Sequence, residues 1–324
     1  MSDLTLITLS YRSGAQITRC LEALSAQDAD IIHADNGSDD LDMAALAAQF
    51  PRVRQVQHGA NLGFAAGMNR AAALARTEWI GFINPDAYVA PDWTDAMQAA
   101  MRRYPDVSIF TALQLNADEP RLMDGAGDCL TFFGFPYRAG LGHLLPDDLQ
   151  NADVFAPCGA AFVIRRSLFA QLGGFDERFF CYCEDADLGF RARLLGERCI
   201  FVPAARTLHV GSASTSVRSD FALWHGYRNR LWLYLKSMPL PLLLITLPIH
   251  IGLTLIGALK DTLKGRKALP WSALSAAITG VGPILAARKN IQRERRITSL
   301  RLAKSLTWNL TKISRREPDH RRLP

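Results

Sequence analysis

Short apolar runs alternate with amphipathic stretches between Leu4 and Phe201. Residues 4–9 form the first strand-like run, and apolar side chains recur at helical spacing across residues 15–26. The same patterns predict the remaining strands and helices of this part of the chain: strands at 31–34, 53–56, 79–83 and 198–202, and helices at 65–76, 91–103 and 184–195. Alternation of this kind predicts an α/β fold with a mostly parallel sheet covered by helices on both faces.

The pattern changes after Leu235. Residues 237–259 contain no charged side chain, and this length is enough to cross a hydrocarbon core of about 30 Å. Three prolines and His250 within the run disfavour a spanning helix, so the sequence leaves spanning and surface binding both open. A second uncharged run, 268–287, contains two prolines and two glycines and is a weaker candidate.

Charge is distributed unevenly along the chain. Residues 236–324 carry 17 basic and 4 acidic side chains, a net charge of +13, so the net +6 of the whole chain leaves −7 on residues 1–235. Basic and apolar residues interleave beyond Arg288, a pattern that suits an interfacial helix on anionic lipid. We expect a catalytic domain at 1–235 and a helical membrane-associating region at 236–324, with no binding of nucleic acid.

The composition, with 49% hydrophobic and 21% charged residues, predicts a folded protein with a full core. The six cysteines show no paired metal-binding spacing, so we expect reduced thiols, most of them buried. No basic segment precedes the first apolar run, and the sequence therefore predicts no secretory signal. The expected location is the cytoplasmic face of the plasma membrane, with the protein bound peripherally or anchored.

Asn84-Pro85-Asp86 follows the predicted strand 79–83, and the proline ends that strand. The carboxyl ends of strands are where open α/β sheets bind ligands. A carboxylate there can share Mg²⁺ or Mn²⁺ with two phosphates, and His209 could add an imidazole ligand that favours Mn²⁺. The alternatives are an ordinary Asn-Pro-Asp turn and a structural histidine.

Two further segments are typical of nucleotide binding. Asp35 follows the second strand beside Gly37 and could accept a hydrogen bond from the N3–H of a uracil or thymine ring, or it could close the strand as an Asx-turn. Asn61 and Gly63 lead into a helix whose first N–H groups can bind phosphate. Small residues there also serve plain helix–strand packing.

Glu184 and Asp185 open the helix predicted at 184–195. Acidic residues are favoured in a first helical turn because of the helix dipole. One of them could instead act as a general base that removes a proton from an attacking hydroxyl. Asp185 is the preferred candidate and Glu184 the alternative.

In this order, the segments resemble the inverting family 2 glycosyltransferases of the GT-A fold, particularly a rhamnosyltransferase-like branch. The resemblance covers about residues 3–235. It rests on the segments 8–11, 35–38, 61–64, 84–86, 173–177, 184–188, 209 and 225–229. Each segment is weakly informative alone, and the ordered set is specific.

The resemblance implies transfer of a sugar from a nucleoside diphosphate to a polysaccharide or lipid-linked acceptor, with Mg²⁺ or Mn²⁺. It implies a role for each matching residue: donor binding by Thr8, Ser10, Tyr11, Asp35, Asn61, Gly63, Asn84 and Arg228, metal binding by Asp86 and His209, and proton removal by Asp185. Asn84 departs from the family pattern, in which the metal motif often begins with Asp. The branch favours dTDP-rhamnose as donor, ahead of UDP-galactofuranose and UDP-hexoses.

Two other functions remain open on the sequence. One is a non-catalytic nucleotide-sugar-binding subunit of a polysaccharide assembly complex, which the acidic residues at each expected position disfavour. The other is a nucleotidyltransferase, which also uses acidic metal sites on an α/β sheet. The chain does not open with the Gly-rich, basic triphosphate loop that such an enzyme needs.

Overall fold

The computed structural model describes residues 3–211 and 219–323. Its strands, in chain order, are β1 (Leu4–Ser10), β2 (Asp30–Asp35), β3 (Val53–Gln57), β4 (Trp79–Ile83), β5 (Ala87–Val89), β6 (Ile109–Asn116), β7 (Met123–Gly125), β8 (Asp128–Leu130), β9 (Pro136–Arg138), β10 (Ala152–Val154), β11 (Ala161–Arg165) and β12 (Cys199–His209). Its α-helices are α1 (Ala15–Ser25), α2 (Met43–Gln49), α3 (Gly63–Ala72), α4 (Trp93–Arg103), α5 (Arg166–Gln171), α6 (Glu184–Leu194), α7 (Asp220–Ser237), α8 (Leu240–Leu263), α9 (Leu269–Thr279), α10 (Val281–Glu294), α11 (Ser299–Ala303) and α12 (Leu310–Arg315). The first two residues, on which part of the expectation about a secretory signal rests, lie outside the described residues.

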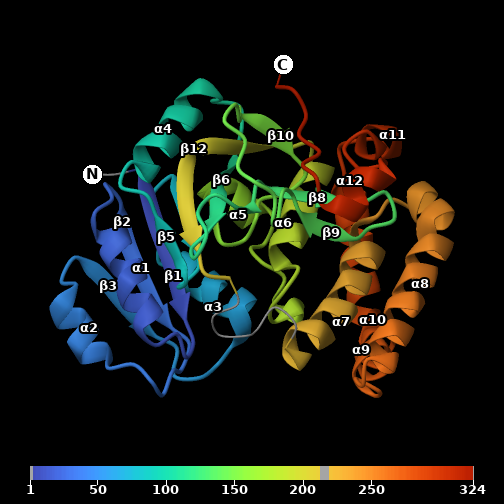
Figure 1. Cartoon of the computed structure of the whole chain (residues 1–324), viewed down its shortest axis with the longest axis horizontal. Helices are drawn as coiled ribbons and strands as arrows, with labels where there is room; N and C mark the ends of the chain where they lie inside the picture. The colour runs from blue at the N-terminus through green and yellow to red at the C-terminus, as the bar shows by residue number, and fades with distance from the viewer. Residues whose placement is uncertain (1–2, 212–218, 324) are drawn as a thin grey trace.

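A central sheet runs in the order β10-β12-β6-β11-β4-β1-β2-β3, with β5 beside β12 and β7 beside β6 (Figure 1). Strands β3, β2, β1 and β4 are parallel, as are β6 and β12, and β11 joins the two groups antiparallel to both neighbours. Every residue of β1 and β4 is buried because helices cover both faces of this part of the sheet. The predicted α/β fold is confirmed.

Most of the predicted elements form where the pattern places them, and β4 has the predicted bounds. Helix α3 ends at Ala72, four residues before the predicted end. The prediction that the last strand ends at residue 202 was wrong. Strand β12 continues to His209, and a register shift between Val202 and Arg206 accommodates the proline as a bulge. His209 is therefore the last residue of this strand.

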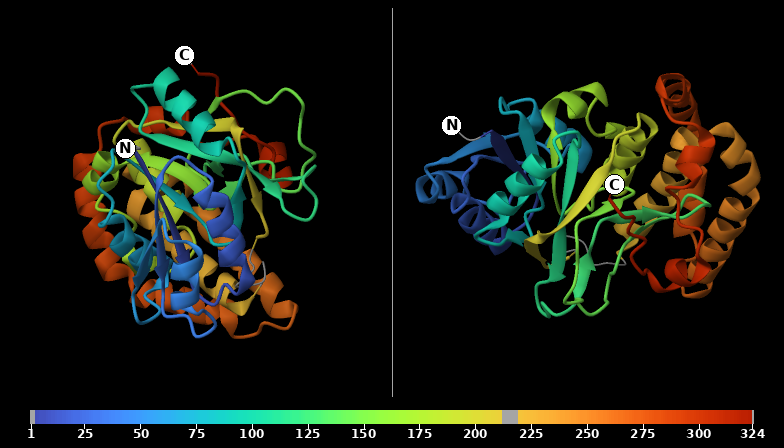
Figure 2. Two further views of the ribbon diagram at one scale, coloured as in Figure 1. Left: turned by 90° about the vertical axis from the view of Figure 1, so that its left-hand side faces the viewer. Right: turned by 90° about the horizontal axis from the view of Figure 1, so that it is seen from above.

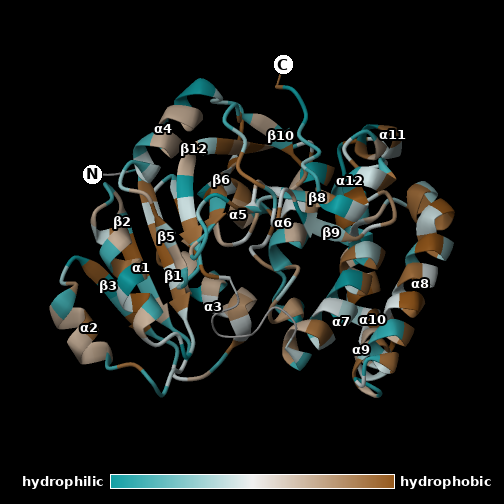
Figure 3. Ribbon diagram, viewed as in Figure 1, coloured by the Kyte–Doolittle hydropathy of each residue, from teal (hydrophilic) through white to brown (hydrophobic). Residues whose placement is uncertain are grey.

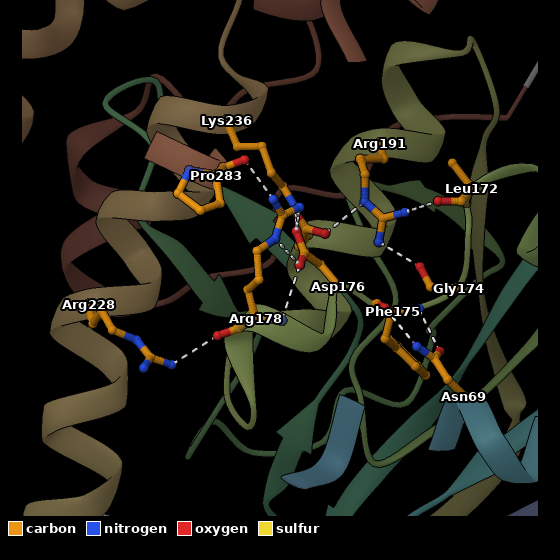
Figure 4. A network of polar contacts seen from close by, with 11 residues as sticks. Asn69, Leu172, Gly174, Phe175, Asp176, Arg178, Arg191, Arg228, Lys236 and Pro283 are labelled. Atoms are coloured by element: carbon orange, nitrogen blue, oxygen red, sulfur yellow. Dashed lines mark hydrogen bonds and ion pairs between the residues drawn. The ribbon is translucent and has the colours of Figure 1, made fainter. Parts of the chain in front are cut away.

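The helices that follow residue 219 gather beside the sheet, at the end of the molecule away from β3 (Figures 1 and 2). Helix α7 packs against α9 and α10 and crosses the domain boundary expected at residue 235. Lys236, which directly precedes the uncharged run 237–259, has a side chain only 1% exposed that forms ion pairs with Asp176 and Asp187. Figure 4 shows this network, in which Arg178 and Arg191 also take part. Buried ion pairs thus tie the beginning of the C-terminal region to the α/β body.

Helix α8 contains 24 residues, has a mean hydropathy of 2.2 in its most apolar stretch and is long enough to cross a membrane. One face packs on the protein through Thr246, His250 and Thr254, all buried. The opposite face leaves large apolar side chains exposed: Leu240, Leu244, Ile245, Ile249, Ile251, Leu253, Leu255, Ile256, Leu259 and Leu263. Figure 3 shows this helix as a mostly hydrophobic ribbon at the edge of the molecule.

Candidate active site

A cavity of about 620 Å³ opens beyond the carboxyl ends of β1 and β4, where the topology predicts a ligand site. Its volume suits a small-molecule ligand. The predicted site residues that line it are Tyr11, Asn61, Gly63, Asn84, Asp86, Glu184, Asp185 and His209. The structure therefore brings the metal candidates and the base candidates to one cavity, although they lie far apart in the sequence.

The predicted metal ligands lie on neighbouring elements. Asp86 precedes β5, which pairs with the end of β12, and Nε2 of His209 lies 3.4 Å from Oδ1 of Asp86. The other ring nitrogen, Nδ1, lies 2.6 Å from Oδ2 of Asp124, which in turn pairs with Arg138. A carboxylate on the far side of a histidine fixes the ring orientation, as it does in many metal sites.

The charges of His209 and Arg138 and those of Asp86 and Asp124 stabilise one another. Burial lowers the pKa of His209, but hydrogen bonds to Asp124 and Asp86 outweigh it and raise the pKa to about 9. Burial also opposes ionisation of Asp124, yet the hydrogen bond from His209 and the charge of Arg138 hold the pKa of Asp124 below its ordinary value. The imidazole is thus protonated at neutral pH in the absence of a cation and must lose this proton to bind one.

The donor set fits a cation that takes most of its ligands from a diphosphate. Among the residues that the structure describes, no group of three or more His, Cys, Asp or Glu side chains is arranged to hold a metal ion. Asp86 and His209 offer one carboxylate and one imidazole. The two can hold Mg²⁺ or Mn²⁺ together with phosphate oxygens and water, and are too few for a cation bound by protein alone.

The preferred base, Asp185, lies in the first turn of α6. Its Oδ2 accepts a hydrogen bond of 2.8 Å from the backbone N–H of Gly159, and its Oδ1 accepts one from the N–H of Ala186. A Cβ at position 159 would lie 2.5 Å from Oδ2, so glycine is needed for this approach. The carboxylate is therefore held in one orientation at the wall of the cavity.

Of the two base candidates, Glu184 is buried and Asp185 is half-buried. Burial raises the pKa of Asp185, and the N–H groups of Ala186 and Gly159 offset part of that rise. Burial and the neighbouring Asp185 raise the pKa of Glu184 well above its ordinary value. Oε2 of Glu184 has no hydrogen-bond partner within residues 3–211 and 219–323, whereas both oxygens of Asp185 are bonded. The better-fixed carboxylate is Asp185.

Two of the predicted donor residues shape the loop before α3. Oδ1 of Asn61 accepts hydrogen bonds from the N–H of Gly63 and from Nδ2 of Asn36. Gly63 has φ of 79°, and a Cβ there would lie 2.5 Å from the ring of Phe180. Gly63 thus admits the aromatic ring that closes this side of the cavity.

Four of the predicted donor residues do not line the cavity. Asp35 borders an adjoining shallow depression, where its carboxylate accepts hydrogen bonds from the N–H groups of Gly37 and Ser38, as in the Asx-turn alternative. Ser10 bonds to His33 and Asp35 inside the sheet, and Thr8 is fully buried against Cys20. Both side chains lie on a covered face of the sheet, Thr8 against Cys20 of α1 and Ser10 beside His33 of β2, and neither lines the cavity.

Arg228 is the fourth of these residues, and it contacts backbone instead of the cavity. Its Nη2 donates to the carbonyl oxygens of Arg178 and Phe179, and its guanidinium lies over the rings of Trp224 and Trp232. These contacts hold the chain just before α6. The six cysteines are free, and four of them are buried, as expected.

Sequence reasoning missed several residues that line the cavity or support it. Asp128 lines the wall near Asp185, and burial together with the charge of Asp185 raises its pKa well above the ordinary value. Arg138, Gln114 and Cys158 also line the cavity. A signal was present in Asp124-Gly-Ala-Gly-Asp128, where two acids flank small residues, but short strands such as β7 and β8 show no clear periodicity.

Comparison with known proteins finds similarity to glycosyltransferases. The Glycosyl transferase family 2 model matches residues 5–173. The N-acetylglucosaminyl-diphospho-decaprenol L-rhamnosyltransferase of Mycobacterium tuberculosis is 30% identical over 241 residues, which cover 66% of this chain and 78% of that protein. The rhamnosyltransferase WbbL of Escherichia coli is 28% identical and covers 68% of this chain and 88% of its own.

Solved structures agree on the fold. S. aureus TarS superposes with a TM-score of 0.58 at 16% identity, over 93% of this chain and 54% of that one. The mannosyltransferase PcManGT from Pyrobaculum calidifontis, in complex with GDP-Man and Mn²⁺, superposes with a TM-score of 0.54 at 17% identity, over 93% of this chain and 85% of its own. This chain therefore spans about half the length of TarS and most of PcManGT.

Proposed function

Because the chain belongs to glycosyl transferase family 2, we propose that it transfers L-rhamnose from dTDP-rhamnose, with inversion, to a lipid-linked or polysaccharide acceptor. It is a glycosyltransferase that uses a nucleotide-sugar donor. The observation that carries the proposal is that one cavity holds both the fixed Asp185 carboxylate and the Asp86–His209 pair.

In the proposed reaction, Asp185 removes the proton from an acceptor hydroxyl as the oxygen attacks the anomeric carbon of the donor. The bond from that carbon to the diphosphate oxygen breaks on the opposite face, and the single displacement inverts the anomeric centre. Asp185 suits this role because two N–H groups orient its carboxylate at the cavity wall. The nucleoside diphosphate leaves with the electron pair of the broken bond.

Asp86 and His209 are the residues that would hold a divalent cation beside the leaving diphosphate. When bound there, Mg²⁺ or Mn²⁺ supplies positive charge that stabilises the leaving group. Asp124 fixes the orientation of the imidazole through its Nδ1, and Arg138 in turn pairs with Asp124. The presence of Mn²⁺ in the PcManGT complex is consistent with this assignment.

The choice of sugar and acceptor rests on the relatives. The mycobacterial and the Escherichia coli proteins are both named as rhamnosyltransferases, and the first name also specifies a diphospho-decaprenol acceptor. We propose the same chemical class of acceptor here, a glycan carried by a polyprenyl diphosphate. A UDP-galactofuranose or UDP-hexose donor is the alternative.

We also propose that the protein binds the cytoplasmic face of the plasma membrane through its C-terminal region. The exposed apolar face of α8 supports surface binding, since its other face is engaged with the protein through Tyr234–Thr246 and His250–Phe133 hydrogen bonds. The net charge of +13 on residues 236–324 suits anionic lipid. A membrane-bound acceptor would then lie beside the enzyme.

The test is a transfer assay of the purified protein with a panel of nucleotide sugars and a polyprenyl-diphosphate acceptor, with and without Mn²⁺ or Mg²⁺. We expect release of dTDP and an inverted glycosidic product. The Asp185→Asn variant should bind donor normally and lose about 10²- to 10⁴-fold in kcat. Release of pyrophosphate would indicate a nucleotidyltransferase, and donor binding without turnover would indicate a non-catalytic subunit.

A further inference from the structure

The backbone immediately before α6 is held in an unusual conformation. Phe180, Tyr182 and Cys183 have φ of 65°, 70° and 68°, in the left-handed region that residues other than glycine rarely adopt. Cys183 is also the N-cap of α6, and its side chain makes no capping hydrogen bond. Three such residues within four positions require support from outside the loop. This loop determines where the first turn of α6, with Glu184 and Asp185, begins.

The support comes from one amide side chain on α7. Asn229 is 0% exposed, and its Nδ2 donates to the carbonyl oxygens of Phe179, Cys181 and Tyr182 at 3.0, 2.8 and 2.8 Å. Its Oδ1 accepts a hydrogen bond of 2.9 Å from Nε of Arg228, which fixes which way the amide points. Nη2 of Arg228 donates to the same Phe179 carbonyl at 2.9 Å.

The three carbonyl groups converge on a single donor atom. Carbonyl oxygens that converge repel one another unless a donor lies between them, and a buried carbonyl without a partner is costly. The left-handed residues turn these carbonyls inward, and the Asn229 amide satisfies them there. The amide and the loop conformation therefore stabilise each other.

We propose that Asn229 is a positioning residue for the general base of this enzyme. It acts through the backbone of residues 179–183, which it locks in the conformation that starts α6 at Glu184 and directs Asp185 toward the N–H of Gly159. This inference rests on the proposed function, in which Asp185 is the base. Under this proposal, Asn229 and Arg228 do not bind the donor; they orient the base.

The test is the Asn229→Asp variant, which keeps the size of the side chain and removes both N–H donors. A carboxylate there faces three carbonyl oxygens, so the loop should relax and the base should move. We expect kcat to fall by about 30- to 100-fold, the loss that a displacement of roughly 1 Å at a reacting group produces. We expect kcat to change more than the donor KM or the dissociation constant for dTDP, because the loop leads directly into Asp185 and contacts the donor segment around Gly63 through Phe180.

Asn309→Asp is the matched control. This variant makes the same change from an amide to a carboxylate, at the N-cap of α12. There the Oδ1 of Asn309 only accepts hydrogen bonds, from the N–H groups of Thr311 and Lys312. Aspartate keeps this role, so this variant should retain the kcat of the unmodified protein. Thermal unfolding of both variants shows whether a loss of kcat arises from global unfolding.

Two further variants cover the case in which Asn229→Asp does not fold. Arg228→Lys keeps the charge of a half-buried side chain but cannot reach both the Asn229 oxygen and the Phe179 carbonyl, and it should lower kcat with donor KM unchanged. In an Asn229→Ala background, Cys183→Gly should recover part of the lost kcat, because glycine adopts a φ near 68° without strain. A merely structural role for Asn229 would not give this recovery in kcat.

The outcomes separate the two proposals. A folded Asn229→Asp variant with normal kcat overturns the positioning role, and so does a variant whose main change is a higher donor KM, since that indicates donor binding. If Asn229→Asp does not fold, an unchanged kcat in Arg228→Lys or no recovery by Cys183→Gly overturns it. Absence of sugar transfer by the unmodified protein overturns the proposed function, and the positioning role with it.

Discussion

The carboxylate of Asp185 accepts a hydrogen bond of 2.8 Å from the backbone N–H of Gly159, a residue 26 positions earlier in the chain. The approach is possible only because position 159 has no side chain: a Cβ would lie 2.5 Å from Oδ2 and 3.1 Å from Cγ of Asp185. The orientation of the proposed base thus depends on a glycine that lines the same cavity and belongs to a distant segment of the chain.

Gly159→Ala should therefore displace the base without removing it. We expect kcat to fall by about 10- to 100-fold, with dTDP binding retained. Steady-state kinetics and calorimetric titration with dTDP measure the two quantities. Gly226→Ala is the matched control, because a Cβ at position 226 would meet no described atom within 4 Å apart from its chain neighbours and the nearby backbone of its own helix. Equal kcat in both variants would contradict the role of the close approach.

The raised pKa of Asp185 predicts the acidic limb of the pH profile. Burial raises this pKa, and the base works only in its ionised form. As the pH falls through the raised pKa, Asp185 takes up a proton and kcat/KM falls. The loss should therefore begin at a higher pH than for an ordinary aspartate, whose pKa is about 3.9. A limb at or below that value, measured where dTDP binding stays constant, would contradict a raised pKa for the base.

Asp124 should control cation binding through His209. Asp124→Asn removes the charge that orients the imidazole and raises its pKa, and loss of such a supporting carboxylate lowers metal affinity by about 10- to 100-fold. The measurement is titration of Mn²⁺ into the protein with dTDP bound. Asp118→Asn, an exposed change on the loop after β6, is the control. An unchanged Mn²⁺ affinity in Asp124→Asn would place the cation elsewhere.

The exposed face of α8 should provide membrane affinity. Ile245 and Ile256 are 71% and 65% exposed, so replacing both with glutamate should leave the fold intact. We expect binding to phosphatidylglycerol vesicles to weaken at least roughly tenfold, since two large apolar groups are lost from the interface. Leu144→Glu, at a site 69% exposed on the α/β body, is the control. Vesicle flotation measures all three proteins, and equal binding would rule out α8 as the contact.

Lys236 should contribute strongly to stability. Lys236→Met leaves Asp176 and Asp187 buried without the ammonium group, although Arg178 and Arg191 still contact them. We expect the free energy of unfolding in urea to fall by about 3 kcal/mol. Lys312→Met, which breaks a half-exposed ion pair with Asp319, should cost less than about 1 kcal/mol. Similar losses in the two variants would show that the buried ion pairs of Lys236 contribute no more to the free energy of unfolding than the partly exposed pair of Lys312.

The candidate site could be predicted in part because some of its residues directly follow apolar strands. Asp86 was identified in this way, since β4 is a continuous apolar run that ends at a proline. Asp124, Asp128 and Arg138 were missed because they come from the short strands β7, β8 and β9. No local pattern indicates that Asp124 meets His209, 85 positions later.

The sequence by itself determined the α/β framework and the order of the motifs, because hydrophobic periodicity and turn chemistry act over a few residues. Only the tertiary structure decided which side chains share the cavity: Ser10 and Thr8 lie on a covered face of the sheet, and Arg228 donates to backbone carbonyl groups before α6. It also buried Lys236 between two aspartates of the body. These outcomes depend on contacts between distant segments, which form only when the whole chain packs.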